Sequence, residues 1–213
     1  MLGYWLPATS LISARARAHY GVEATLGTGV ALTFDDGPHP KGTPAVLEAL
    51  GDNVATFFLV GEQVERRPEL VSRIVAAGHE IGVHCHRHRS LLRLGRRAVH
   101  DDLERAAALI ADAAGREPTL YRPPYGILNA TALEEAGARG WRTLLWSRWG
   151  KDWRRRATAD SIVRCIGPLR AGDVVLLHDA DYYSAANSWQ RTVAAVPRLV
   201  ESLHDSGLEA RLP

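Results

Sequence analysis

Short apolar segments alternate with longer amphipathic ones from about residue 28 to the C-terminus. Runs of β-branched and other apolar residues are typical of buried strands, whereas apolar residues repeated every three or four positions are typical of helices. Strands that alternate with helices indicate a parallel sheet. The pattern predicts strands at Val30–Phe34, Ala55–Val60, Glu80–Val83, Leu120–Arg122, Thr143–Trp146, Val174–Leu177 and Leu208–Leu212.

The segments between these strands carry apolar stripes at helical spacing. A glycine directly after such a stripe commonly ends a helix, because it adopts the left-handed conformation without strain. Thr43 and Pro44 have the residue types of an N-cap and of the first helical position. The predicted helical stripes run over 64–74 before Gly78, over 99–110 before Gly115 and over 193–203 before Gly207.

Polar residues that could take part in catalysis or ligand binding follow five of the predicted strands. A barrel gathers the carboxyl ends of its strands around one mouth, whereas an open doubly wound sheet spreads them along a line. We therefore expect an α/β fold of the distorted (β/α) barrel type, with about seven parallel strands. Residues 1–27 are expected to form an irregular N-terminal arm, and residues 28–213 a single domain.

The composition is that of an ordinary globular protein, with 46% hydrophobic and 23% charged residues among 213. A net charge of +2 gives no reason to expect nucleic acid binding, and the run Arg154–Arg156 fits a solvated rim. Two cysteines, Cys85 and Cys165, do not suggest a disulfide framework. No apolar run approaches the roughly 18 residues of a membrane span.

The first residues lack the charged and apolar regions of a signal peptide. We therefore expect a cytoplasmic protein, with secretion or the cell wall as the alternative if the natural N-terminus is longer. We also expect a monomer.

Two carboxylates, Asp35 and Asp36, close the first predicted strand. Adjacent strand residues point to opposite faces, so the two can share one task only if the chain turns there. Gly37 and Pro38 provide residues for such a turn. The alternative is a surface turn with two solvated carboxylates.

Three histidines, His84, His86 and His88, follow the strand predicted at 80–83. In an extended segment all three would share one face, so their spacing leaves His86 open as a ligand beside the other two. Carboxylate and imidazole groups together suit a divalent metal such as zinc, and a second carboxylate would remain free as a base. The two motifs therefore suggest a metal-dependent hydrolase, with chance loop histidines as the alternative.

Three further motifs follow later strands. The segment Arg122–Gly126 contains two prolines that fix the backbone, so it can hold an arginine against a carboxylate, although a structural turn is the simpler interpretation. Three tryptophans lie within residues 146–153, where they serve either core packing or stacking on sugar rings. His178 follows a wholly apolar strand. It is either a catalytic group or a buried histidine with its hydrogen bonds satisfied.

Taken together and in this order, these motifs resemble the polysaccharide deacetylase family, also called the NodB-homology domain or carbohydrate esterase family four. The resemblance covers residues 30 to about 213. It implies a distorted (β/α) barrel that binds one divalent metal, normally zinc, with cobalt or nickel as substitutes. It also implies a deacetylase that acts on N-acetylated sugars, as in chitooligosaccharides or peptidoglycan, or on a small acetylated compound.

The resemblance implies a role for each matching position in metal binding and catalysis. Asp36, His84 and His88 match the metal ligands. The positions that match catalytic groups are Asp35 as general base, Arg122 as its partner, His178 as general acid and Asp152 as the carboxylate that tunes that histidine.

The same resemblance implies a substrate-binding wall. Tyr125 matches the residue whose backbone N–H helps to hold the oxyanion. Trp153 and Leu176 match the sides of the acetyl pocket, and Trp149 is expected to stack on a sugar ring. The segment 179–184, with Trp189 beyond it, follows the strand of His178 and is expected to border the cleft.

Three residues depart from the family pattern, namely Cys85, Arg89 and Trp149. None of them replaces a predicted ligand, but each changes the surroundings of the site. We expect an acetylated carbohydrate as the substrate. An O-acetyl esterase of the xylan type is the alternative that uses the same site, and a non-catalytic carbohydrate-binding relative would require a missing base, acid or ligand.

Overall fold

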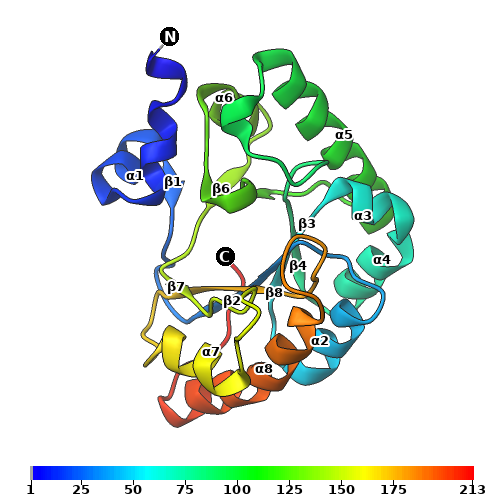
Figure 1. Ribbon diagram of the computed structural model, residues 1–213, viewed down its shortest axis with the longest axis vertical. Helices are drawn as coiled ribbons and strands as arrows, with labels where there is room; N and C mark the ends of the chain where they lie inside the picture. The colour runs from blue at the N-terminus through cyan, green and yellow to red at the C-terminus, as the bar shows by residue number, and fades with distance from the viewer. Residues whose placement is uncertain (1) are drawn as a thin grey trace.

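The computed structural model describes residues 2–213 and contains one curled sheet of eight parallel strands (Figure 1). The strands lie in the order β1-β6-β5-β4-β3-β2-β8-β7, so the sheet is open between β1 and β7. The predicted distorted barrel is therefore confirmed as a partly closed one. The strands are β1 (Val22–Glu23), β2 (Ala31–Asp35), β3 (Thr56–Leu59), β4 (Glu80–Val83), β5 (Leu120–Tyr121), β6 (Arg142–Leu144), β7 (Arg148–Trp149) and β8 (Val174–His178).

Helices surround the outside of the curled sheet in Figure 1, and their apolar sides pack against it. The helices are α1 (Ala14–Tyr20), α2 (Gly42–Leu50), α3 (Gly61–Arg66), α4 (Pro68–Ala76), α5 (Arg96–Ala114), α6 (Ala130–Ala138), α7 (Ala159–Ile166) and α8 (Ser188–Asp205). Short 3₁₀ turns lie at η1 (Leu2–Tyr4), η2 (Leu6–Leu11), η3 (Leu91–Arg93) and η4 (Pro124–Gly126). Among residues 2–213, no helix has both the length and the apolarity needed to cross a bilayer.

The central strands β2, β3 and β8 are almost wholly buried, which explains their continuous apolar sequences. The parallel register aligns their carboxyl ends, so that Asp35 pairs with both His178 and Phe58. β3 in turn pairs with β4, where Leu59 lies opposite Val83. Residues that follow these strands therefore meet at one end of the barrel.

Most predicted elements lie where the pattern places them, and β4 matches its predicted residues. The stripe over 99–110 lies within α5, which ends at Gly115 in a left-handed conformation as expected. The stripe over 64–74 is divided between α3 and α4 by Arg67 and Pro68. α2 begins at Gly42, one residue before the predicted cap Thr43.

The strand predicted at Leu208–Leu212 is wrong. This segment forms a single bridge, between Ala210 and Val30, and two flanking backbone hydrogen bonds to Val30. β2 begins at Ala31 and pairs with β8 on one side and with β3 on the other. The C-terminal segment therefore pairs only with Val30, the residue before β2.

The prediction of an irregular N-terminal arm over residues 1–27 is also wrong for the described residues. Ser13 caps α1 by accepting a hydrogen bond from the N–H of Ala16, and Gly21 ends the helix with a φ of +63°. β1 then joins the edge of the sheet beside β6. β1 has only one apolar residue, Val22, so the pattern does not mark it as a strand. The division of the chain at residue 28 stays a prediction.

Candidate metal centre and active site

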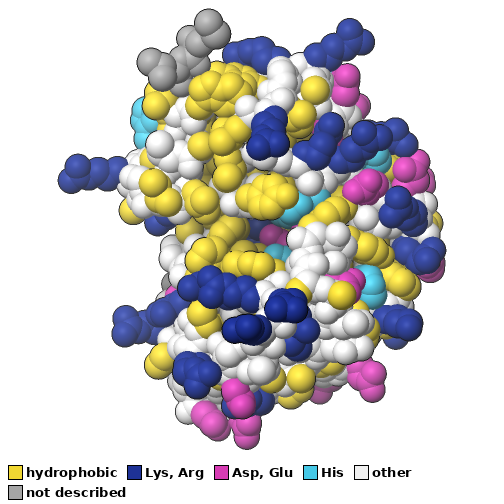
Figure 2. Space-filling view, in the orientation of Figure 1, with side chains coloured by type: hydrophobic (Ala, Val, Ile, Leu, Met, Phe, Trp, Pro, Cys, Tyr) yellow, Lys and Arg dark blue, Asp and Glu magenta, His cyan; other side chains and the backbone are white. Residues whose placement is uncertain are grey.

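A cavity of about 240 Å³ lies at the carboxyl ends of the strands. Figure 2 shows a hollow near the centre of the molecular face, where hydrophobic side chains surround histidine and acidic ones. The residues that line the cavity come from six of the eight strands or the loops after them, as the barrel geometry requires. They are Asp35, Asp36, His84, His88, Tyr125, Trp146, Trp149, Trp153, Leu176, His178, Tyr183 and Ser184.

Asp35 and Asp36 both line this cavity although they are adjacent in sequence. Asp35 is the last residue of β2, and Asp36 has a φ of +79°. This left-handed conformation, which a non-glycine residue rarely adopts, turns the chain and breaks the alternation of a strand. The two carboxylates can therefore serve one site, as the turn hypothesis proposed. Such strained residues concentrate at functional sites.

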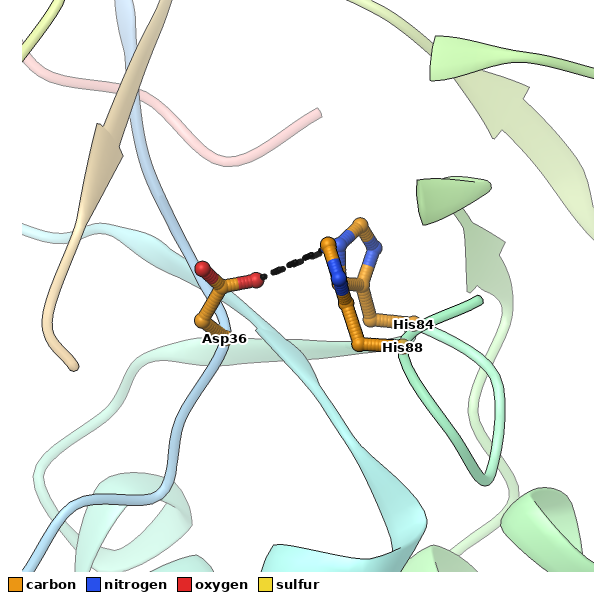
Figure 3. A group of neighbouring side chains, drawn as sticks. All are labelled: Asp36, His84 and His88. Carbon is orange, nitrogen blue, oxygen red and sulfur yellow. Dashed lines mark ion pairs between the residues drawn. The ribbon is translucent and has the colours of Figure 1, made fainter. Parts of the chain in front are cut away.

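Asp36, His84 and His88 form a group with the geometry of a metal site (Figure 3). Their candidate ligand atoms all lie within 4.8 Å of one another. Oδ1 of Asp36 is 3.6 Å from Nε2 of His84 and 3.3 Å from Nε2 of His88. The same Oδ1 is buried without a hydrogen-bond partner among the described residues, so a cation there would satisfy it.

The charge states of these residues also suit a cation. Burial lowers the pKa of both His84 and His88 to about 3, which keeps the imidazoles neutral and their lone pairs free. Burial raises the pKa of Asp36 to about 7, so its carboxylate gains from a positive charge close by. Two imidazoles and one carboxylate leave room for further ligands, as in catalytic rather than structural zinc sites.

His86, which its spacing had left open as a ligand, does not belong to this group. The chain turns at Cys85, which has a φ of +65°, so His86 no longer shares a face with its neighbours. Its ring packs against the backbone of Gly61, where an added Cβ would lie 2.7 Å from Nδ1 of His86. Its backbone N–H donates a hydrogen bond to Asp102 on α5.

Cys85 also lies outside the candidate metal group. Its side chain is fully buried, and its Sγ lies 3.8 Å from the hydroxyl of Tyr121. Burial raises the pKa of the thiol well above its ordinary value, which disfavours the thiolate that binds zinc. The surroundings of Cys85 are therefore those of a packing residue in the segment 84–88, which we call the histidine loop.

We predict that Cys85→Ser leaves the metal content unchanged and changes the activity only a few-fold. A serine hydroxyl can hydrogen-bond to the hydroxyl of Tyr121 in the same space. Elemental analysis of the purified variant, together with acetate release, tests this expectation. A large loss of zinc in a folded Cys85→Ser protein would show that the thiol takes part in coordination.

Asp35 pairs with Arg122 inside the barrel. A guanidinium nitrogen of Arg122 donates a 2.7 Å hydrogen bond to Oδ1 of Asp35, and the same nitrogen donates to the hydroxyl of Thr33. Arg122 is fully buried, and its other donors bond to the carbonyl groups of Leu144 and Leu145. Burial raises the pKa of Asp35, whereas the positive charge of Arg122 opposes this shift.

His178 pairs with Asp152, as the resemblance implied. Nδ1 of His178 lies 2.9 Å from Oδ1 of Asp152, whose other oxygen accepts hydrogen bonds from the backbone N–H of His178 and the hydroxyl of Thr192. Burial by itself would lower the pKa of His178, but the carboxylates of Asp152, Asp36 and Asp35 raise it to about 10. The imidazole is therefore protonated, with Nε2 4.0 Å from Oδ2 of Asp36.

All four predicted substrate-binding residues line the cavity, namely Tyr125, Trp149, Trp153 and Leu176. Trp149 and Tyr125 are 40% and 54% exposed, so both offer aromatic surface to a ligand. The ring of Trp153 meets Trp149 and His178 edge-on, at centroid distances of 5.4 and 5.7 Å. Their individual roles stay predictions.

Sequence reasoning missed several residues that support the site. Thr192 on α8 has no signal of its own, because its contact with Asp152 spans 40 positions. Asp102 could have been found, since an acidic residue lies within the apolar stripe of α5 between Val99 and Leu103. Its buried carboxylate accepts hydrogen bonds from the histidine loop and from Arg89.

Comparisons with known proteins agree with this geometry. A family model described as "Polysaccharide deacetylase" matches residues 23–144. A chitooligosaccharide deacetylase from Sinorhizobium fredii is 36% identical over 196 residues, which cover 87% of this chain and 91% of the relative. A peptidoglycan-N-acetylglucosamine deacetylase from Bacillus cereus is 34% identical over 183 residues, which cover 84% of this chain and 83% of the relative.

The fold agrees as well. The solved structure of a family 4 carbohydrate esterase from Streptomyces lividans, in complex with acetate, aligns with a TM-score of 0.78 at 34% identity. The alignment covers 87% of this chain and 93% of that structure. The chain belongs to the polysaccharide deacetylase family.

Proposed function

We propose that the protein is a metal-dependent hydrolase that removes acetyl groups from the nitrogen of acetamido sugars. One observation carries the proposal. The metal-binding group Asp36, His84 and His88 lies in the same cavity as a carboxylate paired with arginine and a histidine paired with aspartate. Metal-dependent hydrolysis of an amide can use these three elements together, because a water must be activated and an amine leaving group must be protonated.

A divalent metal bound at this group would polarise the acyl carbonyl and lower the pKa of a nearby water. Asp35 is placed to accept the proton of the attacking water. Its Oδ1 is engaged by Arg122, whereas its Oδ2 lies 3.8 Å from Nε2 of His84, on the side of the metal ligands. Since burial raises the pKa of Asp35, its carboxylate is a better proton acceptor than an exposed one.

His178 is placed to donate a proton to the departing nitrogen. Asp152 fixes Nδ1 of the ring, so Nε2 is the atom turned toward Asp36. The pKa of about 10 means that this nitrogen carries a proton at neutral pH. The ring of Trp153 also packs on the imidazole of His178 in an edge-on arrangement. The proposed base and the proposed acid thus lie 3.8 and 4.0 Å, respectively, from an atom of a candidate metal ligand.

The substrate class follows from the cavity and from the relatives. A volume of about 240 Å³ with indole and phenol rings at its mouth suits an acetamido group and an adjoining sugar ring. Two of the relatives described above are named for chitooligosaccharides and for peptidoglycan N-acetylglucosamine. Zinc is the proposed metal, because one carboxylate and two imidazoles suit it, with cobalt or nickel as substitutes.

The proposal is tested by measuring acetate release and metal content in the same preparation. We expect zinc-loaded protein to release acetate from N-acetylglucosamine oligomers, chelator-treated protein to release none, and added zinc to restore the rate. Release from acetylated xylan but not from the amide substrates would replace the proposal by an O-acetyl esterase. No release from either class would favour a carbohydrate-binding relative.

We predict that short soluble acetamido sugars are better substrates than insoluble polymer. The loop between β8 and α8 lies across one side of the cavity, where Tyr183 and Ser184 line it. This loop is tied to the part of the cavity wall that follows β7, because the N–H of Ala185 donates to the carbonyl of Trp153. A polymer would have to pass this loop, whereas a short oligomer would not.

A series of N-acetylglucosamine oligomers from monomer to hexamer measures this effect. We expect kcat/KM to level off within the first few units. A steady rise up to the hexamer, with good activity on polymer, would mean that the cleft is open past the loop.

A further inference from the structure

The two candidate metal histidines are held in different ways. Nδ1 of His84 lies 2.7 Å from the carbonyl oxygen of Arg122, which fixes the ring and leaves Nε2 for the metal. Metal-binding histidines usually have such a hydrogen bond on their second nitrogen. Nδ1 of His88 is buried and has no hydrogen-bond partner within residues 2–213. Something else must fix the orientation of His88.

Two tyrosine rings enclose the imidazole of His88. The ring of Tyr183 stacks on it with a centroid distance of 4.3 Å and an interplanar angle of 11°. The ring of Tyr125 meets it edge-on at 4.6 Å and 66°. Both arrangements are ones that aromatic pairs favour. The imidazole is 7% exposed, so rotation about its side-chain bonds would have to displace one of these rings.

Tyr183 is itself held firmly from outside the cavity. Its hydroxyl donates a 2.6 Å hydrogen bond to Glu62 and accepts one of 3.1 Å from Gln63. Both partners lie in the first turn of α3, which directly follows β3. The phenol ring is therefore fixed at two points, by its loop after β8 and by α3, while its face lies on His88.

We infer that Tyr183 is a positioning residue that fixes the imidazole of His88 by stacking and thereby raises the affinity for the metal. The stacked ring takes the place of the missing hydrogen bond on Nδ1. This inference rests on the metal centre of the proposed function. Removal of a residue that orients a ligand typically weakens metal binding by about 10- to 100-fold. We expect a loss of about 10-fold for Tyr183→Leu, since Tyr125 remains in place.

The test compares the zinc dissociation constants of three variants with that of the wild type, by competition with a chromophoric chelator. Tyr183→Leu removes the aromatic face. Tyr183→Phe keeps the face but loses the bonds to Glu62 and Gln63. Tyr182→Leu is the control for loss of a neighbouring aromatic ring, because Tyr182 packs on His39 and on the ring of Tyr183 but not on His88. We expect weaker binding for Tyr183→Leu, near-normal binding for Tyr183→Phe and no change for Tyr182→Leu.

A second measurement reports the stacking directly. In the metal-free protein, the ring current of Tyr183 shifts the proton resonances of His88, and this shift is expected to persist in Tyr183→Phe and to disappear in Tyr183→Leu. Thermal unfolding checks that each variant folds. If Tyr183→Leu does not fold, Tyr183→Met provides an unbranched side chain without an aromatic face.

Two results would overturn the inference. Zinc binding within twofold of wild type in Tyr183→Leu would show that the stacked ring does not support His88. Equal losses in Tyr183→Phe and Tyr183→Leu would assign the effect to the hydroxyl and α3 rather than to stacking. These results are separate from the deacetylase proposal, because a wild-type protein that binds zinc but releases no acetate would refute that proposal and leave the inference intact.

Discussion

Asp35→Asn is expected to reduce kcat/KM for an N-acetylated oligosaccharide by at least ~100-fold, which is the usual effect of removing a general base. The asparagine oxygen can still accept the hydrogen bond from Arg122, but the side chain can no longer take a proton from water. The metal ligands are untouched, so zinc content is expected to stay near one equivalent. Rate and metal content are measured on the same sample.

The variant also removes the counter-charge of a buried guanidinium, so a lower melting temperature is expected. Arg122 keeps its bonds to the carbonyl groups of Leu144 and Leu145, which favours retention of the fold. Asp36→Asn is the matched control, because the same change one residue away is expected to lower metal content and rate together. Near-normal turnover in Asp35→Asn would remove that residue from the mechanism.

His84→Ala is expected to lose most of the bound metal, and the activity with it. The imidazole provides one of three protein ligands, and its orientation is fixed by the carbonyl of Arg122. With only Asp36 and His88 left, the site has too few ligands to hold zinc tightly. Elemental analysis and acetate release, measured before and after addition of zinc, quantify both losses.

His86→Ala is the control that the histidine loop itself provides. His86 is buried beside Gly61 and lies outside the candidate metal group, so this variant is expected to keep its zinc, although the lost packing lowers its stability. Full occupancy in His84→Ala, together with loss of zinc in a folded His86→Ala protein, would exchange the roles of the two histidines.

The sequence predicts which residues gather at this site better than it predicts how their side chains are oriented. Apolar runs place the carboxyl ends of β2, β4 and β8, and a parallel sheet brings together whatever follows them. The position of Asp35, Asp36 and the histidine loop is therefore predictable from pattern alone. The exclusion of His86 from the metal group is not predictable from pattern, because it depends on the left-handed conformation of Cys85. No residue type in that loop indicates this conformation.

Contacts between distant segments are the other part that pattern does not supply. The pairing of Asp152 with His178 was expected only from the resemblance to a family, since no spacing rule connects a loop residue with a strand end 26 positions later. The stacking of Tyr183 on His88 joins loops almost a hundred residues apart. β1 and β7 each pair one apolar residue with a charged one, so neither has the apolar run that marks the other strands.

The burial of Arg122 has a consequence for experiments that rank residues by the effect of replacing them. This side chain donates to the carbonyl groups of Leu144 and Leu145 at the end of β6, and to Thr33 and Asp35 in β2. It therefore joins two regions of a sheet that is open at one edge. A replacement such as Arg122→Lys would lose the planar fork that reaches all of these acceptors. Protein yield and turnover are then expected to fall together when Arg122 is replaced. A screen that measures only yield would assign Arg122 a structural role, and one that measures only turnover would assign it a catalytic role. Its single guanidinium group serves both.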